Sequence, residues 1–156
     1  MRLSSKELKR AQANGNRFIP SERQTLHQVV KWLKLAHPTV LFFFDYGADA
    51  LLTPRQAKER KDLSCVRGWT ELMIFEPRGE FCGLAIDLKR EDVNVYNKAG
   101  LFANSHLEEQ GKVMDLLTQR GWLACFAKGF LGSITAIEEY LKLHAKIPHN
   151  EKVHLP

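Results

Sequence analysis

Two carboxylates and an ammonium, Glu71, Asp87 and Lys89, stand at the ends of a predicted hairpin, "TELMIFEPRGEFCGLAIDLKR" at residues 70–90. If its turn centres on Gly79, Glu71 and Asp87 face each other roughly 5 Å apart at Cβ. Lys89, two residues further on, then emerges on the same face. A turn shifted by one residue would move one strand's side chains to the other face, so this register is an assumption.

Facing carboxylates repel each other unless a hard cation lies between them, and oxygen ligands of this kind suit Mg²⁺ or Mn²⁺. Such an ion can orient a phosphodiester and generate a hydroxide-like nucleophile. Lys89 would then position the water or stabilise the charge on phosphorus. The alternative is that Glu71 and Asp87 mark where the strands reach solvent, with Lys89 as their surface ion partner.

Two further polar residues fall where a site could use them. Gln110 occupies the next position of an apolar helical stripe that includes Val113, so it must find a partner or line a site. Glu22 lies one turn before Leu26 near a helix start. It is either a charge that favours the helix dipole or a further metal ligand.

The elements that must position these residues follow from caps and periodicity. Before the hairpin, the sequence predicts a helix with a Ser21/Gln24 capping box that ends at His37-Pro38, a buried strand in "VLFFFDYG", and a basic helix capped by Thr53 over 54–63. After the hairpin, it predicts a loop with a small turn near Asn97-Lys98 and then a helix capped by Ser105 and Glu108 that ends at Gly121. The strand "WLACFA" and a helix from Ser133 complete the predicted order. This order predicts an α/β domain with a central mixed β-sheet flanked by helices.

Composition limits the class of protein. The chain has 156 residues and a net charge of +5, which favours an acidic partner such as nucleic acid. No apolar run is long enough for a membrane span, and the basic N-terminus lacks a secretory apolar region. We therefore expect a cytoplasmic protein that is not secreted. We expect residues 1–20 to be a basic arm, 21–145 the domain and 146–156 a tail.

The basic residues are unevenly distributed. Those that could contact phosphates, besides the N-terminal arm, are Arg55, Lys58, Arg60, Lys61, Arg67 and Arg90. A merely solvated surface is the alternative. The absence of a glycine-rich phosphate loop argues against a nucleotide cofactor.

Several other residues are interpreted as structural. The three cysteines lack metal spacing, so we expect reduced, mostly buried thiols without a nucleophilic role. His27 and His106 are expected to be ordinary helical histidines, and Asp45 a turn residue. The run 42–44 and Trp69 are expected to belong to the core.

Four segments resemble the VRR-NUC (virus-type replication-repair nuclease) family of the PD-(D/E)xK nucleases, in its compact phage-type form. They are "LHQVVKWLKLAHPTVLFFFDYG", "TPRQAKERKDL", "GWTELMIFEPRGEFCGLAIDLKRE" and "EEQGKVMDLLTQRGWLACFAKGF". The resemblance implies a restriction-endonuclease-like core and metal-dependent phosphodiester cleavage. By position it implies the following roles: Glu22 as the first-helix acid, Glu71 as the first motif acid, Asp87 and Lys89 as the D/E-x-K pair, and Gln110 as the helix glutamine.

One departure from the family pattern matters for function. The family usually has Pro-Asp where this chain has Thr70-Glu71, and the extra methylene changes the carboxylate's reach. The resemblance implies an Mg²⁺- or Mn²⁺-dependent endonuclease that resolves branched DNA, such as a Holliday junction, as a homodimer. Two alternatives stay open: a non-catalytic DNA-binding module with a decayed site, and a flap or duplex nuclease on the same fold.

Overall fold

The computed structural model describes residues 18–45, 52–66 and 68–145. Its elements, in chain order, are α2 (Glu22–Ala36), β1 (Phe42–Phe44), α3 (Pro54–Leu63), β2 (Leu72–Ile74), β3 (Gly83–Lys89), α4 (Ser105–Thr118), β4 (Trp122–Lys128) and α5 (Gly129–Lys142). This order confirms the predicted one. Among the described residues, no helix is both long enough and apolar enough to cross a bilayer.

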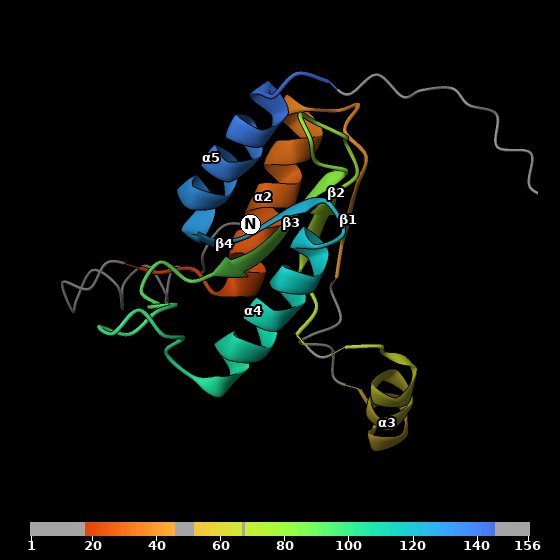
Figure 1. The fold of residues 1–156 in the computed structure, drawn as a ribbon, viewed down its shortest axis with the longest axis vertical. Coiled ribbons are helices and arrows are strands. Elements are labelled where there is room, and N and C mark those ends of the chain that lie inside the picture. The colour runs from red at the N-terminus through yellow and green to blue at the C-terminus, as the bar shows by residue number, and fades with distance from the viewer. Residues whose placement is uncertain (1–17, 46–51, 67, 146–156) are drawn as a thin grey trace, which may run out of the picture.

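The four strands form one mixed sheet in the order β1-β2-β3-β4. The pairs β1–β2 and β2–β3 are antiparallel, whereas β3–β4 is parallel. Helices α2 and α5 pack together on one face of the sheet, and α4 covers β3 and β4 on the other (Figure 1). The predicted α/β architecture, with a central mixed sheet flanked by helices, is therefore confirmed.

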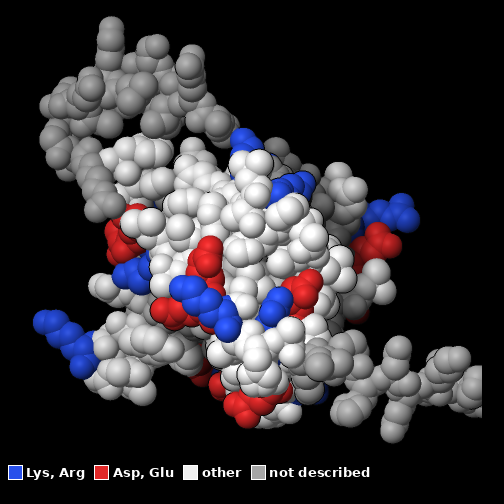
Figure 2. All heavy atoms as spheres, turned by 90° about the horizontal axis from the view of Figure 1, so that it is seen from above, with Lys and Arg blue, Asp and Glu red and all other residues white. Residues whose placement is uncertain are grey.

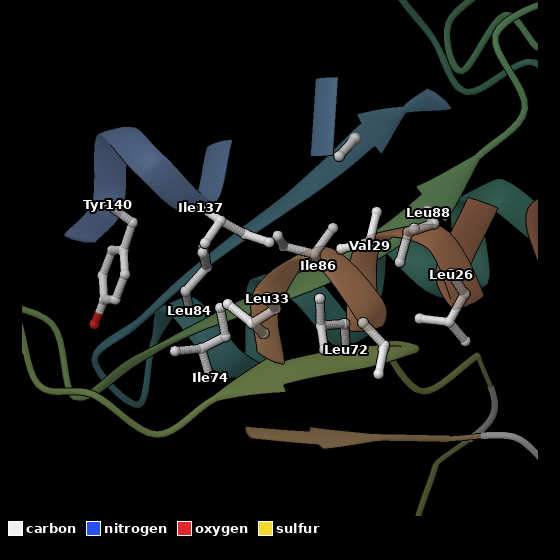
Figure 3. Close-up of a cluster of buried hydrophobic side chains, with 12 residues drawn as sticks. Leu26, Val29, Leu33, Leu72, Ile74, Leu84, Ile86, Leu88, Ile137 and Tyr140 are labelled. Carbon is white, nitrogen blue, oxygen red and sulfur yellow. The ribbon is translucent and has the colours of Figure 1, made fainter. Parts of the chain in front are cut away.

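The main core lies between the sheet and the α2/α5 layer (Figure 3). Even-numbered residues of β2 and β3, such as Leu72, Ile74 and Ile86, point into it, because side chains alternate between the two faces of a strand. Odd-numbered residues of these two strands point toward α4, where Met73 and Ala85 pack with side chains of that helix. The candidate site residues Glu71, Asp87 and Lys89 are also odd-numbered, so they belong to the α4 face.

Side-chain caps define the starts of α2 and α4. Ser21 and Gln24 make both hydrogen bonds of the predicted capping box, at 3.2 and 2.9 Å. The predicted cap of α4 was wrong by one residue: the side chain of Asn104, not Ser105, accepts the Leu107 amide at 2.9 Å.

The predicted start of the last helix was also wrong. α5 begins at Gly129, directly after β4, and Ser133 is buried within it. The Ser133 hydroxyl donates to the Gly129 carbonyl at 2.7 Å, so it bonds inside the helix and does not cap it. A serine hydroxyl can satisfy either role, and the periodicity alone did not distinguish them.

Several burial predictions were wrong. β1 is an edge strand, and its residue Phe43 points away from the main core and is exposed. Its neighbours Phe42 and Phe44 pack against the main core. Trp69 is also exposed, at 41%. The cysteines are free as expected, but Cys65 and Cys82 are exposed and only Cys125 is partly buried.

Candidate functional site

The hairpin register places the predicted residues together. Leu72 pairs with Ile86 and Met73 with Ala85, which confirms the register that sets Glu71 opposite Asp87. The strand lengths differ from the prediction, because β3 continues to Lys89. Asp87 and Lys89 therefore do not mark a solvent-exposed strand end. Both belong to β3, with Lys89 as its last residue, and they are 0% and 4% exposed.

Asp87 and Lys89 form a buried ion pair. The Lys89 Nζ donates to Asp87 Oδ1 at 3.0 Å, since residues two apart on a strand share a face. The other oxygen, Asp87 Oδ2, is buried and accepts no hydrogen bond from any described residue. Burial raises the pKa of Asp87 to about 6, although the Lys89 charge opposes that rise. A buried acceptor without a donor is costly, so its position calls for a ligand.

Glu71 completes the acidic pair from β2's side of the hairpin. Its Oε2 accepts a hydrogen bond from the Leu88 amide at 3.2 Å, which holds the carboxylate beside β3. Burial raises the pKa of Glu71 to about 7, and the nearby Asp87 charge adds to the rise. Its own carbonyl accepts from the Asp45 amide at 2.8 Å, so the segment after β1 also fixes its backbone.

Helix α4 brings Gln110 to the same region. Val113 and Leu117 pack against Ala85 of β3. The step of about one turn from Val113 back to Gln110 on α4 and the step of two residues from Ala85 to Asp87 on β3 are of similar length and run toward the same end of the sheet. Gln110 thus lies over the Asp87 part of the strand. It is 6% exposed, and its Oε1 has no hydrogen-bond partner among the described residues.

Gly68 allows a close approach at this point. It adopts a φ of +73°, and a Cβ there would lie 3.1 Å from Gln110 Cγ and 3.2 Å from the backbone nitrogen of Gln110. The segment before Glu71 therefore rests directly on α4 at Gln110. This contact connects the loop that carries Glu71 to the helix that carries the glutamine.

Two more ionisable residues act on the site electrostatically. Glu22, half-buried at the start of α2, raises the pKa values of both Glu71 and Asp87, so it lies within range of the pair. His106 lowers the pKa of Asp87. The sequence interpretation had set His106 aside as structural. Its spacing of four residues from Gln110, on one face of α4, was the signal that could have identified it.

The donor set fits a hard divalent cation in part. Asp87 Oδ2 and Gln110 Oε1 are buried oxygens without partners, and Glu71 is close by. Oxygen donors of these types suit Mg²⁺ or Mn²⁺. However, in the described part of the chain no three His, Cys, Asp or Glu side chains form a group that could by itself hold a metal. Any ion would therefore need the amide oxygen, backbone groups, water or substrate as further ligands.

The predicted DNA-binding residues are not at one place. Arg55, Lys58 and Lys61 are exposed on α3, which stands apart from the sheet and the other helices (Figure 1). Arg90 is exposed beside the site and pairs with Asp92 at 2.8 Å. Arg67, the side chain of Arg60 and the N-terminal arm through residue 17 lie outside the described residues.

A pocket of about 260 Å³ lies at the other end of α2, between the segment that follows the helix, residues 37–40, and α5. It contains the His37–Glu138 pair, 3.2 Å apart, together with Arg78 and Lys142. Figure 2 views this end, where basic and acidic side chains alternate and form no surface of one sign. The pocket lacks the acid pair, so it is not the candidate site.

Comparison with known proteins supports the fold. No family model matches the sequence, and no curated protein matches it. A solved structure, "VRR_NUC domain protein", matches with a TM-score of 0.57 and 21% sequence identity. The match covers 81% of this chain and 92% of that one. This likeness shows that the chain has the α/β fold of that VRR_NUC domain protein.

Proposed function

We propose that the protein is a metal-dependent endonuclease that hydrolyses phosphodiester bonds in branched DNA, with a four-way junction as its main substrate and a homodimer as its working form. The observation that carries this proposal is the buried Asp87–Lys89 pair beside Glu71, with Asp87 Oδ2 left without a partner. A buried charged cluster of this kind costs stability, so a catalytic use explains it better than a structural one.

Each residue has a role that its geometry allows. Asp87, Glu71 and Gln110 would hold the ion through their oxygens, and Glu22 would add negative charge from α2. A bound Mg²⁺ or Mn²⁺ would supply a Lewis acid and a water that is easily deprotonated. Lys89 uses one Nζ hydrogen on Asp87, which leaves two donors for the attacking water or a phosphate oxygen.

A second candidate is a DNA-binding module without catalytic activity. The absence of a three-ligand acidic group among the described residues favours it, as does Thr70-Glu71 in place of the family's Pro-Asp. Such a module would bind junctions with strong salt dependence and cut none of them.

A cleavage assay separates these candidates. End-labelled four-way junctions, flaps, plain duplex and single strands would each be incubated with Mg²⁺, Mn²⁺ or EDTA. We expect symmetric, metal-dependent nicking of the junction by the wild-type protein. Asp87→Asn should lower the rate by about 100-fold or more, because it removes a charged ligand. Binding without cutting in either metal would support the module, and equal cutting of flaps or duplex would retire the junction specificity.

A matched control excludes a general effect of lost charge. Asp92→Asn removes an exposed carboxylate that pairs only with Arg90 in the described contacts, and it should leave the rate within about twofold. Melting temperatures of both variants would confirm that they fold. If Asp87→Asn folds and cuts as fast as Asp92→Asn, Asp87 has no part in catalysis.

A further inference from the structure

The segment between β3 and α4 begins just after Lys89 and contains a small hairpin. Tyr96 and Phe102 form an antiparallel bridge, and Ala103 donates to the Val95 carbonyl at 2.9 Å. At its tip, Asn97 Oδ1 accepts the amides of Ala99 and Leu101 at 2.9 and 3.1 Å. We call residues 95–103 the β3–α4 hairpin. Figure 1 shows the segment that contains it extending past the end of the sheet.

A row of aromatic rings connects this hairpin to the candidate site. Lys89 Nζ lies 5.8 Å from the centre of the Phe126 ring, which meets the Phe102 ring edge-on at 6.2 Å. Phe102 in turn stacks on Tyr96, with ring centres 5.2 Å apart and planes 30° apart. Phe102 also fills the space above Gly111 of α4. The hairpin is therefore anchored on β4 and α4 rather than free to move away from Lys89.

The outermost ring faces solvent. Tyr96 is 53% exposed and Leu101 is 67% exposed, although both belong to the hairpin that Phe102 packs against β4 and α4. Packing explains Phe102, which is partly buried between two elements, but it does not explain the outward face of Tyr96. Lys98 is the sole charged residue between Val93 and Asn104 in the sequence. The arm thus presents an aromatic face, an apolar neighbour and one positive charge.

Single-stranded nucleic acid is recognised by this combination. An unstacked base has a free π-face that stacks on an aromatic side chain, and a lysine alongside contacts the backbone phosphate. Bases inside a continuous duplex are already stacked, so exposing one is costly. At a branch point the stack is interrupted, and a base there is available to a neighbouring ring.

We propose that the β3–α4 hairpin is a stacking arm that receives an unpaired nucleobase next to the scissile phosphate, with Tyr96 as the platform and Lys98 as the phosphate contact. This inference rests on the proposed nuclease function and adds the element that selects branched DNA over duplex. It connects the platform Tyr96 to Lys89 through the rings of Phe102 and Phe126, so that base stacking and positioning of the phosphate are coupled.

The test uses photocrosslinking, which requires close contact between the base and a side chain. A four-way junction would carry 5-iodouracil beside the branch point, with EDTA present so that nothing is cut. We expect the crosslink to map to Tyr96 and to persist in Tyr96→Phe. Tyr96→Leu keeps an apolar cover over Phe102 without a π-face, and it should lose the crosslink and weaken junction binding about tenfold, with duplex binding unchanged. Leu131→Ala, a change at an exposed residue of α5, should alter neither.

Lys98→Gln provides an independent measurement. It should lower the slope of log affinity against log salt by about one for the junction, because one phosphate contact is lost. Melting temperatures would show that all variants fold. A Tyr96→Leu protein that folds and binds the junction as tightly as wild type would overturn the stacking arm.

The two proposals fail in distinguishable ways. If wild type cuts junctions but Tyr96→Leu leaves both the junction affinity and the preference over duplex unchanged, the arm is wrong and the nuclease stands. If wild type crosslinks through Tyr96 but cuts no DNA in Mg²⁺ or Mn²⁺, the arm stands on the DNA-binding module. A wild-type protein that binds no DNA overturns both.

Discussion

The Asp87–Lys89 pair has a defined geometry although its burial costs free energy of folding. Both are buried, and a single 3.0 Å hydrogen bond joins them. Taking two charges out of water costs several kcal/mol per ion, and their attraction recovers this only in part. The pair is therefore more informative about chemistry than about stability. Its partnerless oxygen, Asp87 Oδ2, points to the same conclusion.

The acid pair should give the metal-free protein a stability that falls as pH rises. The pKa of Glu71 is raised from 4.5 to about 7 and that of Asp87 from 3.8 to about 6. Folded protein then binds more protons than unfolded protein between about pH 4 and pH 7. Each group's contribution is complete below its ordinary pKa and is lost as pH rises through its folded pKa. Melting temperatures in EDTA across this window would show the decline, and Glu71→Gln should flatten it. A melting temperature that rises across the window would contradict these shifts.

Thr70 offers a stability test beside the site. Its side chain is buried, and its hydroxyl has no hydrogen-bond partner among the described residues. Thr70→Val keeps the shape and removes the unpaired group, so we expect it to stabilise the protein by about 1 kcal/mol. Urea denaturation would measure the change. A loss of stability would mean that the hydroxyl meets a partner such as water.

The strand β3 is the element on which the site depends. It pairs with β2 on one side and β4 on the other and has helices on both faces, so every one of its residues is buried. Its even-numbered residues fill the main core, while its odd-numbered residues form the site face. Packing on one face thus fixes the position of the chemistry on the other.

The tight packing at the start of β3 can be tested by substituting Gly83, with Gly132 of α5 as the control. A Cβ at Gly83 would collide with the Trp122 ring and lie 2.6 Å from the Ile74 carbonyl oxygen, so Gly83→Ala should destabilise by roughly 3 kcal/mol. A Cβ at Gly132 in α5 meets nothing within 4 Å. Gly132→Ala should therefore stabilise by about 0.5–1 kcal/mol. Thermal unfolding of both variants would check this, and equal effects would refute the packing argument.

Helix α3 makes a contrasting prediction, because its described side chains are all exposed. Replacing Arg55, Lys58 and Lys61 by Gln should weaken DNA binding and reduce the salt slope by about 2–3, with no change in melting temperature. The control removes Lys31 and Lys34, exposed on α2, and should affect binding less. Unchanged affinity in the α3 variant would show that this helix faces away from DNA.

At the scale of the whole molecule, the two faces of the sheet are covered unequally. Helices α2 and α5 lie together on one face, whereas α4 alone covers β3 and β4 on the other (Figure 1). The site and the β3–α4 hairpin both lie at one end of the α4 layer. The mixed-charge pocket lies at the far end of α2.

The packing of β4 between the helices predicts that the thiol of Cys125 reacts slowly in the folded protein. Burial raises the pKa of Cys125 from 9.0 to about 11, while Cys65 is exposed. The thiolate is the reactive form, so at pH 8 iodoacetamide should modify Cys125 about 100-fold more slowly in the folded protein than in urea. Cys65 should react readily in both. Mass spectrometry of timed samples would follow each site, and rapid folded-state modification of Cys125 would contradict the packing.

The sequence by itself determined the features that depend on neighbouring residues. The Ser21/Gln24 capping box, the bounds of α3 and the hairpin register were all predicted correctly. Hydrogen bonds between residues a few positions apart, together with alternation along strands, specify these features. The set Glu71, Asp87 and Lys89 could be proposed for the same reason.

Only the tertiary structure decided burial and the surroundings of the site. The sequence did not show that β4 extends pairing to Lys89, which turns a supposed strand end into a buried ion pair. It also placed Phe43 in the core, although β1 is an edge strand, and it set aside His106, whose charge lowers the pKa of Asp87. Burial depends on which distant elements cover a residue. That information lies in the packing of α4, β4 and α5 around the sheet, not in any local stretch of sequence.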